Sequence, residues 1–236
     1  MKQSFPTKMR PVSNANESII LAELYRRLYR HYGPQRWWPG DTRLEIIVGA
    51  ILTQNTAWAN VEKAIRNLKA AGLLSSARRL HHINKRSLAR LIKPAGYYNV
   101  KSSRIKNFTR FLFSKYGGSL ERMARRSTEE LSRELIGLNG IGPETRDSIL
   151  LYAFKRPVFV VDAYTKRILS RHGMVKTDAF YDEIQGLFMS HLSANEKMFN
   201  EYHALIVRLG KERCRTSPQC YGCVLGAGKV LENRPM

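Results

Sequence analysis

The sequence is short of cysteine and of long apolar runs. Its three cysteines all lie between Cys214 and Cys223, too few and too close together for a disulfide framework. No uncharged apolar run reaches the roughly 18 residues that a membrane-spanning helix needs. The basic start, MKQSFPTKMRPVSN, has no apolar segment behind it, which argues against a secretory signal. We therefore expect no membrane span and a cytoplasmic protein, nucleoid-associated in a bacterium or archaeon and nuclear in a nucleated cell.

Acidic residues are also scarce. Nineteen Asp and Glu face forty Lys and Arg, which gives a formal net charge of +21. Such an excess repels itself in a compact fold, but it suits a polyanionic partner, because basic side chains release the counterions of phosphates. The basic residues are scattered and do not form a tail, which indicates a charged surface. Nucleic acid is the favoured partner, with ribosome-like or anionic-membrane binding as alternatives.

Strand-forming sequence is thin. The only good β-branched run is residues 158–161, Val-Phe-Val-Val, and a single run cannot make a sheet. Elsewhere the apolar residues recur at helical spacing, after a flexible polar lead over residues 1–15. The pattern predicts an all-α fold of about ten helices.

Helix boundaries carry recognisable signals. Thr42 with Glu45 and Ser127 with Glu130 have the spacing of capping boxes. Three later helices are predicted over residues 163–172, 179–192 and 196–213.

Residues 138–145, Leu-Asn-Gly-Ile-Gly-Pro-Glu-Thr, are the most informative stretch. Gly140 and Gly142 permit a tight turn with positive φ and close backbone approach. Ile141 between them can pin the turn to the core, and Pro143 suits the first position of a new helix. Exposed amides of such a turn can bind a phosphate, although an ordinary corner between helices would look the same.

An acid follows this turn at a suggestive place. A helix predicted from Pro143 to Phe154 leads into the extended run, and Asp162 stands between that run and the next helix. Asp162 can be a simple N-cap. It can also be a carboxylate at the mouth of a groove, beside the phosphate-binding turn.

The turn together with residues 160–165, Val-Val-Asp-Ala-Tyr-Thr, resembles the helix-hairpin-helix glycosylases of the endonuclease III superfamily, from about Trp37 to Cys223. The resemblance implies a monomer with a DNA-binding cleft between two helical domains, residues 16–40 with 150–236 and residues 41–149. It implies a target nucleotide flipped out of double-stranded DNA toward a catalytic aspartate, which Asp162 matches. The DNA-binding residues would be Gly140, Ile141, Gly142, Thr145, Gln54 and Asn55.

One position departs from the bifunctional members of that superfamily. They carry a nucleophilic lysine just after the glycine turn, where this chain has Glu144. A carboxylate cannot form the Schiff base of lyase chemistry. The resemblance therefore predicts a monofunctional glycosylase, with Glu144 itself read as an exposed residue favoured by the helix dipole.

Two further segments bear on the substrate. Gln54, in Ile-Leu-Thr-Gln-Asn-Thr, matches the glutamine that fills the gap left by the flipped base. The sequence Trp-Trp-Pro followed by this segment resembles the branch called 3-methyladenine DNA glycosylase III. That likeness implies an aromatic pocket for an alkylated purine, whose positive charge favours a π face. The pocket residues would be Trp37, Trp38, Pro39 and Trp58.

The three cysteines are the last informative feature of the sequence. Many superfamily members bind a four-cysteine iron–sulfur cluster here, but Cys214, Cys220 and Cys223 lack a fourth partner in this sequence, and the first gap looks one residue short. A metal-free loop is favoured over a 4Fe-4S cluster with an unusual fourth ligand, and zinc is the third alternative.

The sequence thus predicts a base excision repair enzyme that hydrolyses the N-glycosidic bond of alkylated purines resembling 3-methyladenine. The alternatives are a glycosylase for oxidised pyrimidines or mismatched bases, and a helix-hairpin-helix DNA-binding protein without catalysis.

Overall fold

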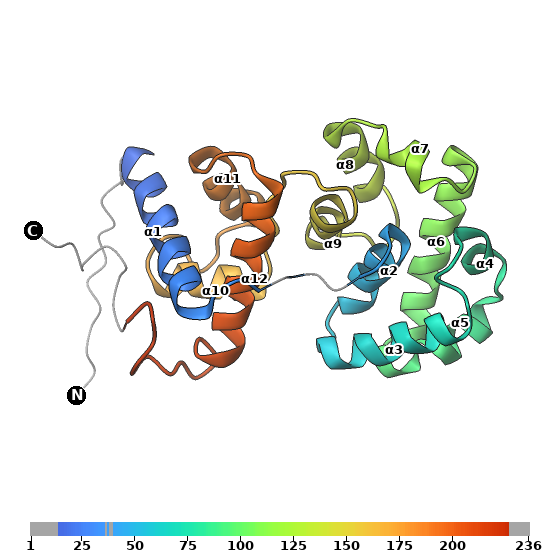
Figure 1. The fold of residues 1–236 in the computed structure, drawn as a ribbon, viewed down its shortest axis with the longest axis horizontal. Helices are drawn as coiled ribbons and strands as arrows, with labels where there is room; N and C mark the ends of the chain where they lie inside the picture. The colour runs from blue at the N-terminus through green and yellow to red at the C-terminus, as the bar shows by residue number, and fades with distance from the viewer. Residues whose placement is uncertain (1–13, 36, 38–39, 227–236) are drawn as a thin grey trace, which may run out of the picture. The chain divides into compact units, whose positions relative to one another are not determined.

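The computed structural model describes residues 14–35, 37 and 40–226, and these residues form two compact units. Unit 1 takes the described residues up to Pro34, Ala163–Ser193 and the described residues from Leu205 onward. Unit 2 takes Gln35–Asp162 and Ala194–Ala204. The described ranges contain helices and no β-strand, which confirms the all-α prediction (Figure 1). No helix in these ranges is long and apolar enough to cross a membrane.

Unit 1 is built on the amphipathic first helix. Its helices are α1 (Asn14–Tyr32), α10 (Ala163–Arg171), α11 (Tyr181–His191) and the later part of α12 (Glu196–Glu212). Leu21, Leu24 and Leu28 lie on one face of α1 and are at most 1% exposed. Helix α1 packs against α11.

Unit 2 is organised around a helix that is buried on every side. Its elements are α2 (Arg43–Thr53), α3 (Trp58–Ala70), α4 (Ala77–His82), α5 (Lys85–Leu91), η1 (Lys93–Ala95), α6 (Tyr98–Tyr116), α7 (Leu120–Ala124), α8 (Thr128–Ile136), α9 (Pro143–Ser148), the π-helical η2 (Ile149–Ala153) and the start of α12. Every residue of α2 from Leu44 to Leu52 is buried. A helix this apolar belongs inside a domain, and α2 packs against α3, α6, α9 and η2.

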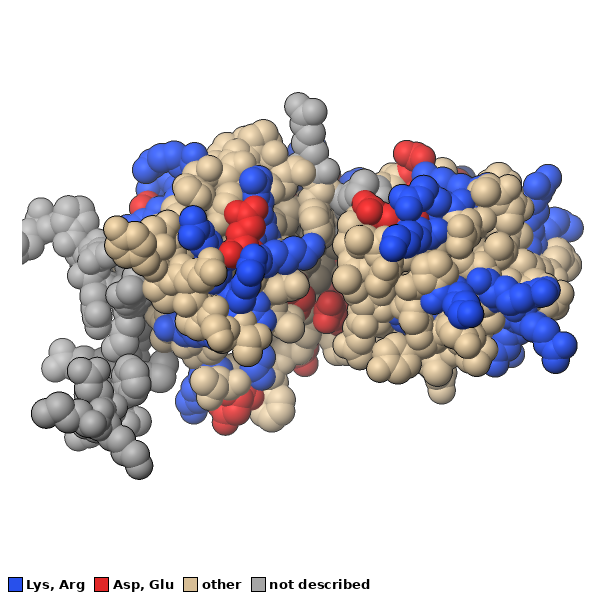
Figure 2. Space-filling view, turned by 90° about the horizontal axis from the view of Figure 1, so that it is seen from below, with Lys and Arg blue, Asp and Glu red and all other residues tan. Residues whose placement is uncertain are grey.

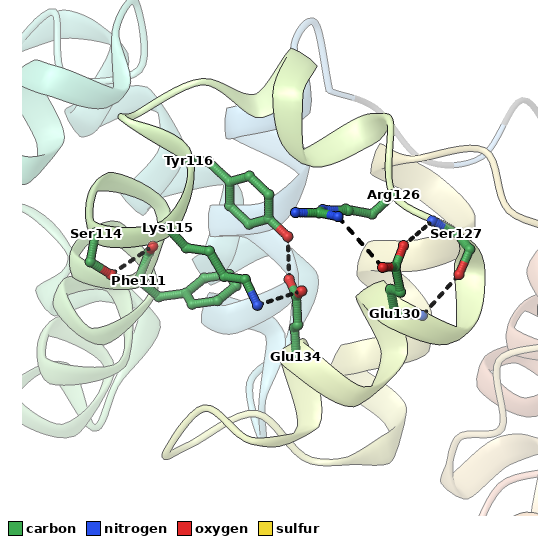
Figure 3. A network of polar contacts seen from close by, with 8 residues as sticks. All are labelled: Phe111, Ser114, Lys115, Tyr116, Arg126, Ser127, Glu130 and Glu134. Atoms are coloured by element: carbon green, nitrogen blue, oxygen red, sulfur yellow. Dashed lines mark hydrogen bonds and ion pairs between the residues drawn. The ribbon is translucent and has the colours of Figure 1, made fainter.

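The two predicted capping boxes differ in outcome. Ser127 and Glu130 bond reciprocally, with N–O distances of 3.1 and 3.0 Å, and so form a complete box (Figure 3). Thr42 accepts from the Glu45 amide at 3.2 Å, but the Glu45 carboxylate reaches the amide of Asp41. The second helix start is therefore capped by a threonine alone.

A polar network joins the end of α6 to α8. Glu134 of α8 forms an ion pair of 2.7 Å with Lys115 and accepts a hydrogen bond from the Tyr116 hydroxyl (Figure 3). Burial raises the pKa of Tyr116 to about 12, so this hydroxyl remains a donor at physiological pH. The network orients α8, which leads directly into the glycine turn.

Two local expectations were incomplete and a third was confirmed. The described residues contain twelve α-helices, more than the ten or so predicted, because short helices such as α4 and α7 are too brief to show a period. The helix predicted from Pro143 to Phe154 changes at Ile149 into the π-helical η2. Residues 158–161 are extended without forming a strand.

Candidate active site

The glycine turn between α8 and α9 has the hairpin form that its sequence predicted. The amide of Ile141 donates to the Leu138 carbonyl at 3.0 Å and closes the turn. Ile141 is 5% exposed, so it anchors the turn in the core as expected. Pro143 opens α9 with Gly142 as its N-cap.

Only one of the two glycines is needed for the backbone conformation. Gly140 has a φ of +94°, and a Cβ there would lie 2.3 Å from Cγ of Arg104. Gly142 has a φ of −91°, and a Cβ there would meet no atom within 4 Å. Gly140 is therefore fixed by close approach, whereas Gly142 leaves open space beside the start of α9.

Asp162 stands at the end of the extended run and is largely covered. Its side chain is 11% exposed, and Phe159, Val160 and Val161 before it are buried. The carboxylate Oδ2 lies 3.6 Å from Nε2 of His203 in α12. An acid in such a setting is screened little by solvent, which strengthens its interaction with nearby charge.

His203 connects Asp162 to a buried tyrosine. Nδ1 of His203 and the hydroxyl of Tyr152 are 2.6 Å apart, and Tyr152 interacts in turn with the side chain of Trp37. Tyr152 is 1% exposed and His203 is 5% exposed. Burial, with Asp162 second, raises the pKa of Tyr152 well above its ordinary value. The tyrosine thus stays neutral and holds the imidazole in place.

Glu144 belongs to the same electrostatic environment. Crowding by protein groups, followed by repulsion from Asp162, raises the pKa of Glu144 to about 6, while His203 acts in the opposite direction. Glu144 nevertheless remains exposed at the start of α9. Because the side chain is exposed, solvent screens part of this effect, and a water molecule or substrate has access to the carboxyl group.

The turn after α2 approaches the hairpin. Nε2 of Gln54 donates to the Gly140 carbonyl and to Oγ1 of Thr145, both at 2.9 Å. Thr145 is 6% exposed, so its hydroxyl faces this contact. Asn55 is exposed and has a φ of +50°. The structure thus brings Gln54, Gly140 and Thr145 together as a packed contact, with Asn55 at its rim.

The predicted aromatic residues are described in part. Trp38 and Pro39 lie outside the described residues. The rings of Trp37 and Trp58 have centroids 6.4 Å apart and are tilted by 39°. Nε1 of Trp58 donates to Glu62 at 2.8 Å, which fixes the ring's orientation.

A pocket of about 300 Å³ opens beside Trp58. It is lined by Gly40, Asp41, Glu45, Gly49, Trp58, Glu62, Ile65, Arg66 and Lys69. Lys69 lies between two of the acids, 2.7 Å from Asp41 and 2.8 Å from Glu45. This volume is at the lower end of the range of small-molecule pockets, and its wall combines an aromatic face with carboxylates.

A family model for "HhH-GPD superfamily base excision DNA repair protein" matches residues 48–193 of this chain. The chain belongs to the HhH-GPD superfamily. A Methanocaldococcus jannaschii protein named "Putative DNA repair glycosylase MJ1434" is 48% identical over 210 residues, covering 88% of this chain and 94% of the relative. Endonuclease III of Thermotoga maritima is 29% identical over 207 residues, covering 87% and 90%.

Solved structures of HhH-GPD proteins have the same fold. The H. pylori 3-methyladenine DNA glycosylase MagIII, bound to 1,N6-ethenoadenine, superposes with a TM-score of 0.70 at 27% identity, covering 83% of this chain and 97% of that one. A trapped endonuclease III–DNA covalent intermediate superposes with a TM-score of 0.74 at 20% identity, covering 90% and 93%. The chain is thus placed among the base excision DNA glycosylases.

The iron–sulfur cluster of many HhH-GPD proteins would need the cysteine loop. Cys214, Cys220 and Cys223 line one pocket of about 250 Å³ in unit 1, and Cys214 is buried. Among residues 14–35, 37 and 40–226, no group of three or more His, Cys, Asp or Glu side chains is arranged to hold a metal ion. A guanidinium nitrogen of Arg171 lies 3.3 Å from Sγ of Cys214. The described residues around these cysteines therefore show no assembled metal site.

Two arginines, Arg167 and Arg171, hold the cysteine loop through hydrogen bonds. Arg171 donates to the carbonyls of Arg215 and Thr216 at 2.5 and 2.8 Å. Arg167 donates to the Cys214 carbonyl at 2.8 Å. Helix α10, which carries both arginines, therefore holds the loop through hydrogen bonds to its backbone.

The surface has the charge pattern expected of the composition. Figure 2 shows Lys and Arg side chains spread over the described part of one face, more widely than Asp and Glu. On this face the basic residues have the scattered distribution predicted from the sequence.

Sequence reasoning did not find His203 or Tyr152. Both lie inside apolar helical stretches, where a histidine or tyrosine usually fills the core. No sequence signal singled out Tyr152, which lies in the π-helical η2. Glu144 was noticed as the replacement of a lysine, but its raised pKa depends on neighbours that only the fold brings close.

Proposed function

We propose that this protein is a monofunctional DNA glycosylase that removes alkylated purines resembling 3-methyladenine from double-stranded DNA. The observation that carries the proposal is the group of side chains in unit 2 formed by Asp162, His203, Tyr152, Trp37 and Glu144. This group brings together the Asp162 carboxylate, an aromatic wall, and Glu144, an acid that cannot act as an amine nucleophile.

Asp162 supplies the chemistry of bond cleavage. As the N-glycosidic bond breaks, positive charge develops at the sugar C1′, and the Asp162 carboxylate stabilises it or orients the attacking water. His203, 3.6 Å away, limits the positions that the carboxylate can take. Because an alkylated base already carries positive charge and leaves readily, the reaction needs little acid catalysis.

The residue after the hairpin argues against a lyase step. Glu144 occupies the position where bifunctional relatives carry a lysine, and a carboxylate forms no Schiff base with the opened sugar. The product would be an intact abasic strand.

The choice of base rests on the tryptophans. Trp37 is linked through Tyr152 and His203 to Asp162, and its ring lies 6.4 Å from that of Trp58. A cationic purine gains from stacking on an electron-rich ring such as that of Trp58, which lines the pocket. The likeness to the H. pylori enzyme with its bound ethenoadenine supports a modified purine as the substrate class.

DNA would be held by the hairpin and by the positive surface. The open space at Gly142 and the amides at the start of α9 suit a phosphate. The net charge of +21 supplies sequence-independent attraction.

A panel of duplexes with single defined lesions tests the proposal. The panel contains 3-methyladenine, 1,N6-ethenoadenine, oxidised pyrimidines, and thymine or uracil opposite guanine, assayed for abasic sites with and without alkali. We expect release of the alkylated purines and strand breaks only after alkali. Release of oxidised pyrimidines or of the mismatched bases alone would overturn the substrate class, and a borohydride-trapped adduct would overturn the monofunctional mechanism.

Substitution of one tryptophan sharpens the test. Trp58→Ala should lower release of the alkylated base by about tenfold or more, since base–aromatic stacking is worth roughly 1–3 kcal/mol. Trp58→Phe keeps a π face and should recover most of the rate. Equal losses in both variants, or an equal loss of thermal stability, would assign Trp58 to packing.

A further inference from the structure

The buried histidine beside Asp162 has one ring nitrogen in a hydrogen bond and one without. His203 is 5% exposed, and its Nδ1 lies 2.6 Å from the Tyr152 hydroxyl. Its Nε2 is also buried and has no hydrogen-bond partner among the described residues. This nitrogen faces Oδ2 of Asp162 at 3.6 Å, a distance longer than a hydrogen bond. Because an unsatisfied buried polar atom costs free energy, a histidine that only filled the core would be a poor choice here.

The two ends of this arrangement decide which groups donate. A carboxylate such as that of Asp162 only accepts hydrogen bonds, and the indole N–H of a tryptophan only donates. Trp37 acts on the Tyr152 hydroxyl in the direction of a donor. Tyr152 and His203 stand between these ends in unit 2, and each of them can both donate and accept. The arrangement is satisfied when the protons all point from Trp37 toward Asp162.

The tautomer of His203 follows from this order. Burial keeps Tyr152 protonated, so its hydroxyl has a proton to donate, and Nδ1 of His203 is in place to accept it. The ring proton is then on Nε2, on the side of Asp162. The opposite tautomer would turn the Nε2 lone pair toward the carboxylate, and solvent would screen this repulsion little in a buried site.

We propose that His203 is a positioning residue for Asp162: Tyr152 holds the ring proton on Nε2, and this N–H donates to Oδ2 when damaged DNA is bound. Contacts of catalytic groups that are long in a free protein often shorten in the substrate complex. The bond would fix one carboxylate oxygen and leave the other for the sugar. The inference rests on the proposed function, because it takes Asp162 as the group that stabilises the charge at C1′.

The bond also matters because of a second carboxylate. Asp162 and Glu144 repel each other electrostatically. A hydrogen bond donated to a carboxylate favours its charged form. A donor on the buried side of Asp162 therefore offsets part of the repulsion from Glu144 without placing any group between the carboxylate and the sugar.

Two amide substitutions separate the roles of the two ring nitrogens. In His203→Gln the side-chain amide reaches the place of Nε2 and can still donate to Asp162. In His203→Asn the shorter side chain reaches only the place of Nδ1, so it keeps a partner for Tyr152 but offers the aspartate no donor. A residue that only fills the core would respond alike to both changes. His82→Gln, at an exposed position in α4, is the control.

The first measurement needs no base release. It compares the affinity of each protein for two duplexes that differ only in the abasic analogue, a neutral tetrahydrofuran or a cationic pyrrolidine. We expect the wild type, His82→Gln and His203→Gln to prefer the cationic analogue. His203→Asn should lose about tenfold of this preference, the scale on which a hydrogen bond to a charged group contributes. Because the preference is a ratio within one protein, a general loss of stability or of DNA affinity cancels.

The second measurement determines the tautomer. Long-range 1H–15N correlation spectra of the whole protein with 15N-labelled histidine distinguish protonated from unprotonated ring nitrogens. The His203 signals are those that disappear in His203→Gln. We expect a proton on Nε2 alone in the wild type, and a mixture of both tautomers in Tyr152→Phe, which removes the donor to Nδ1.

Undiminished preference for the cationic analogue in His203→Asn would overturn the inference. Equal losses in His203→Asn and His203→Gln would do the same, as would a wild-type ring with a proton on Nδ1. Failure of the proposed function would look different. The wild type would then release no alkylated purine, whereas its preference for the cationic analogue and the dependence of that preference on His203 would persist.

Discussion

Nε2 of His203 lies 3.6 Å from the carboxylate of Asp162, and Nδ1 of the same ring contacts the Tyr152 hydroxyl at 2.6 Å. The two ring nitrogens thus have different neighbours: Nδ1 lies beside the buried neutral hydroxyl of Tyr152, and Nε2 lies on the side of the Asp162 carboxylate. Because both groups are buried or nearly so, their electrostatic interaction is screened little by solvent.

Asp162→Asn should abolish base release. Removing a preorganised charge that stabilises a developing cation costs on the order of 100-fold or more in rate. Single-turnover assays at saturating enzyme measure this loss, and DNA affinity should stay within a few fold. Asp178→Asn, at an exposed position, is the control. A near-normal rate for Asp162→Asn would remove the aspartate from the mechanism.

The pKa of Glu144, about 6, predicts a step in the pH profile. Below this pH Glu144 is neutral, and above it Glu144 adds negative charge near a cationic transition state. Single-turnover base release should therefore accelerate as the pH rises through about 6. Glu144→Gln should lose this step and fall below the wild type at higher pH. Superimposable profiles for the two proteins would show that Glu144 is electrostatically remote from the reaction.

The two glycines of the hairpin should respond differently to alanine. Gly140→Ala introduces a Cβ into Arg104 at a φ of +94°, so we expect a loss of about 1–3 kcal/mol in the free energy of unfolding. Gly142→Ala meets open space at a φ of −91° and should leave stability nearly unchanged. Denaturant unfolding of both variants measures the contrast, which equal losses would contradict.

Lys101 should make stability depend on alkaline pH. Burial lowers its pKa from 10.5 to about 8, so the unfolded chain binds more protons between these two values. Stability therefore gains a contribution as the pH rises from about 8 toward 10.5. Lys101→Met should lack this gain and be less stable at pH 7 by about 1–3 kcal/mol, because the Leu52 and Ala95 carbonyls lose a donor. Parallel curves of stability against pH for the two proteins would show that Lys101 is not the group responsible.

The local stability of the cysteine loop should depend on Arg171 more than on the cysteine side chains. Arg171→Ala removes the bonds to the Arg215 and Thr216 carbonyls and should speed amide exchange and proteolysis within the loop. Cys220→Ser, at an exposed position, should change neither. Iron or zinc that co-purifies in stoichiometric amount, and is lost from Cys220→Ser, would restore the metal-binding interpretation.

Local signals predicted the hairpin well because its chemistry is local. The burial of Ile141, the place of Pro143 at a helix start and the capping box of Ser127 each depend on a few neighbouring residues. The partners of Asp162 could not be predicted in this way. His203 lies 41 positions later in the chain, in a helix whose apolar period gives no sign of a polar contact.

The change of helix type at Ile149 was equally hidden. Residues 149–153, Ile-Leu-Leu-Tyr-Ala, contain no proline or glycine, so the sequence reads as a continuous helix. Packing against α2 accompanies the π-helical geometry, and Tyr152 lies within it. Because π-helical turns re-aim side chains, this turn bears directly on where the Tyr152 hydroxyl points.

The division of the chain between the units sets an order of synthesis. Unit 1 begins with α1 but needs α10, α11 and the end of α12, whereas the main stretch of unit 2, Gln35–Asp162, is translated between them. Unit 2 can therefore begin to fold on the ribosome while the apolar face of α1 has no partner from α11. The nascent chain thus carries an exposed amphipathic helix through most of translation, which makes α1 the segment most exposed to chaperones and to misassociation.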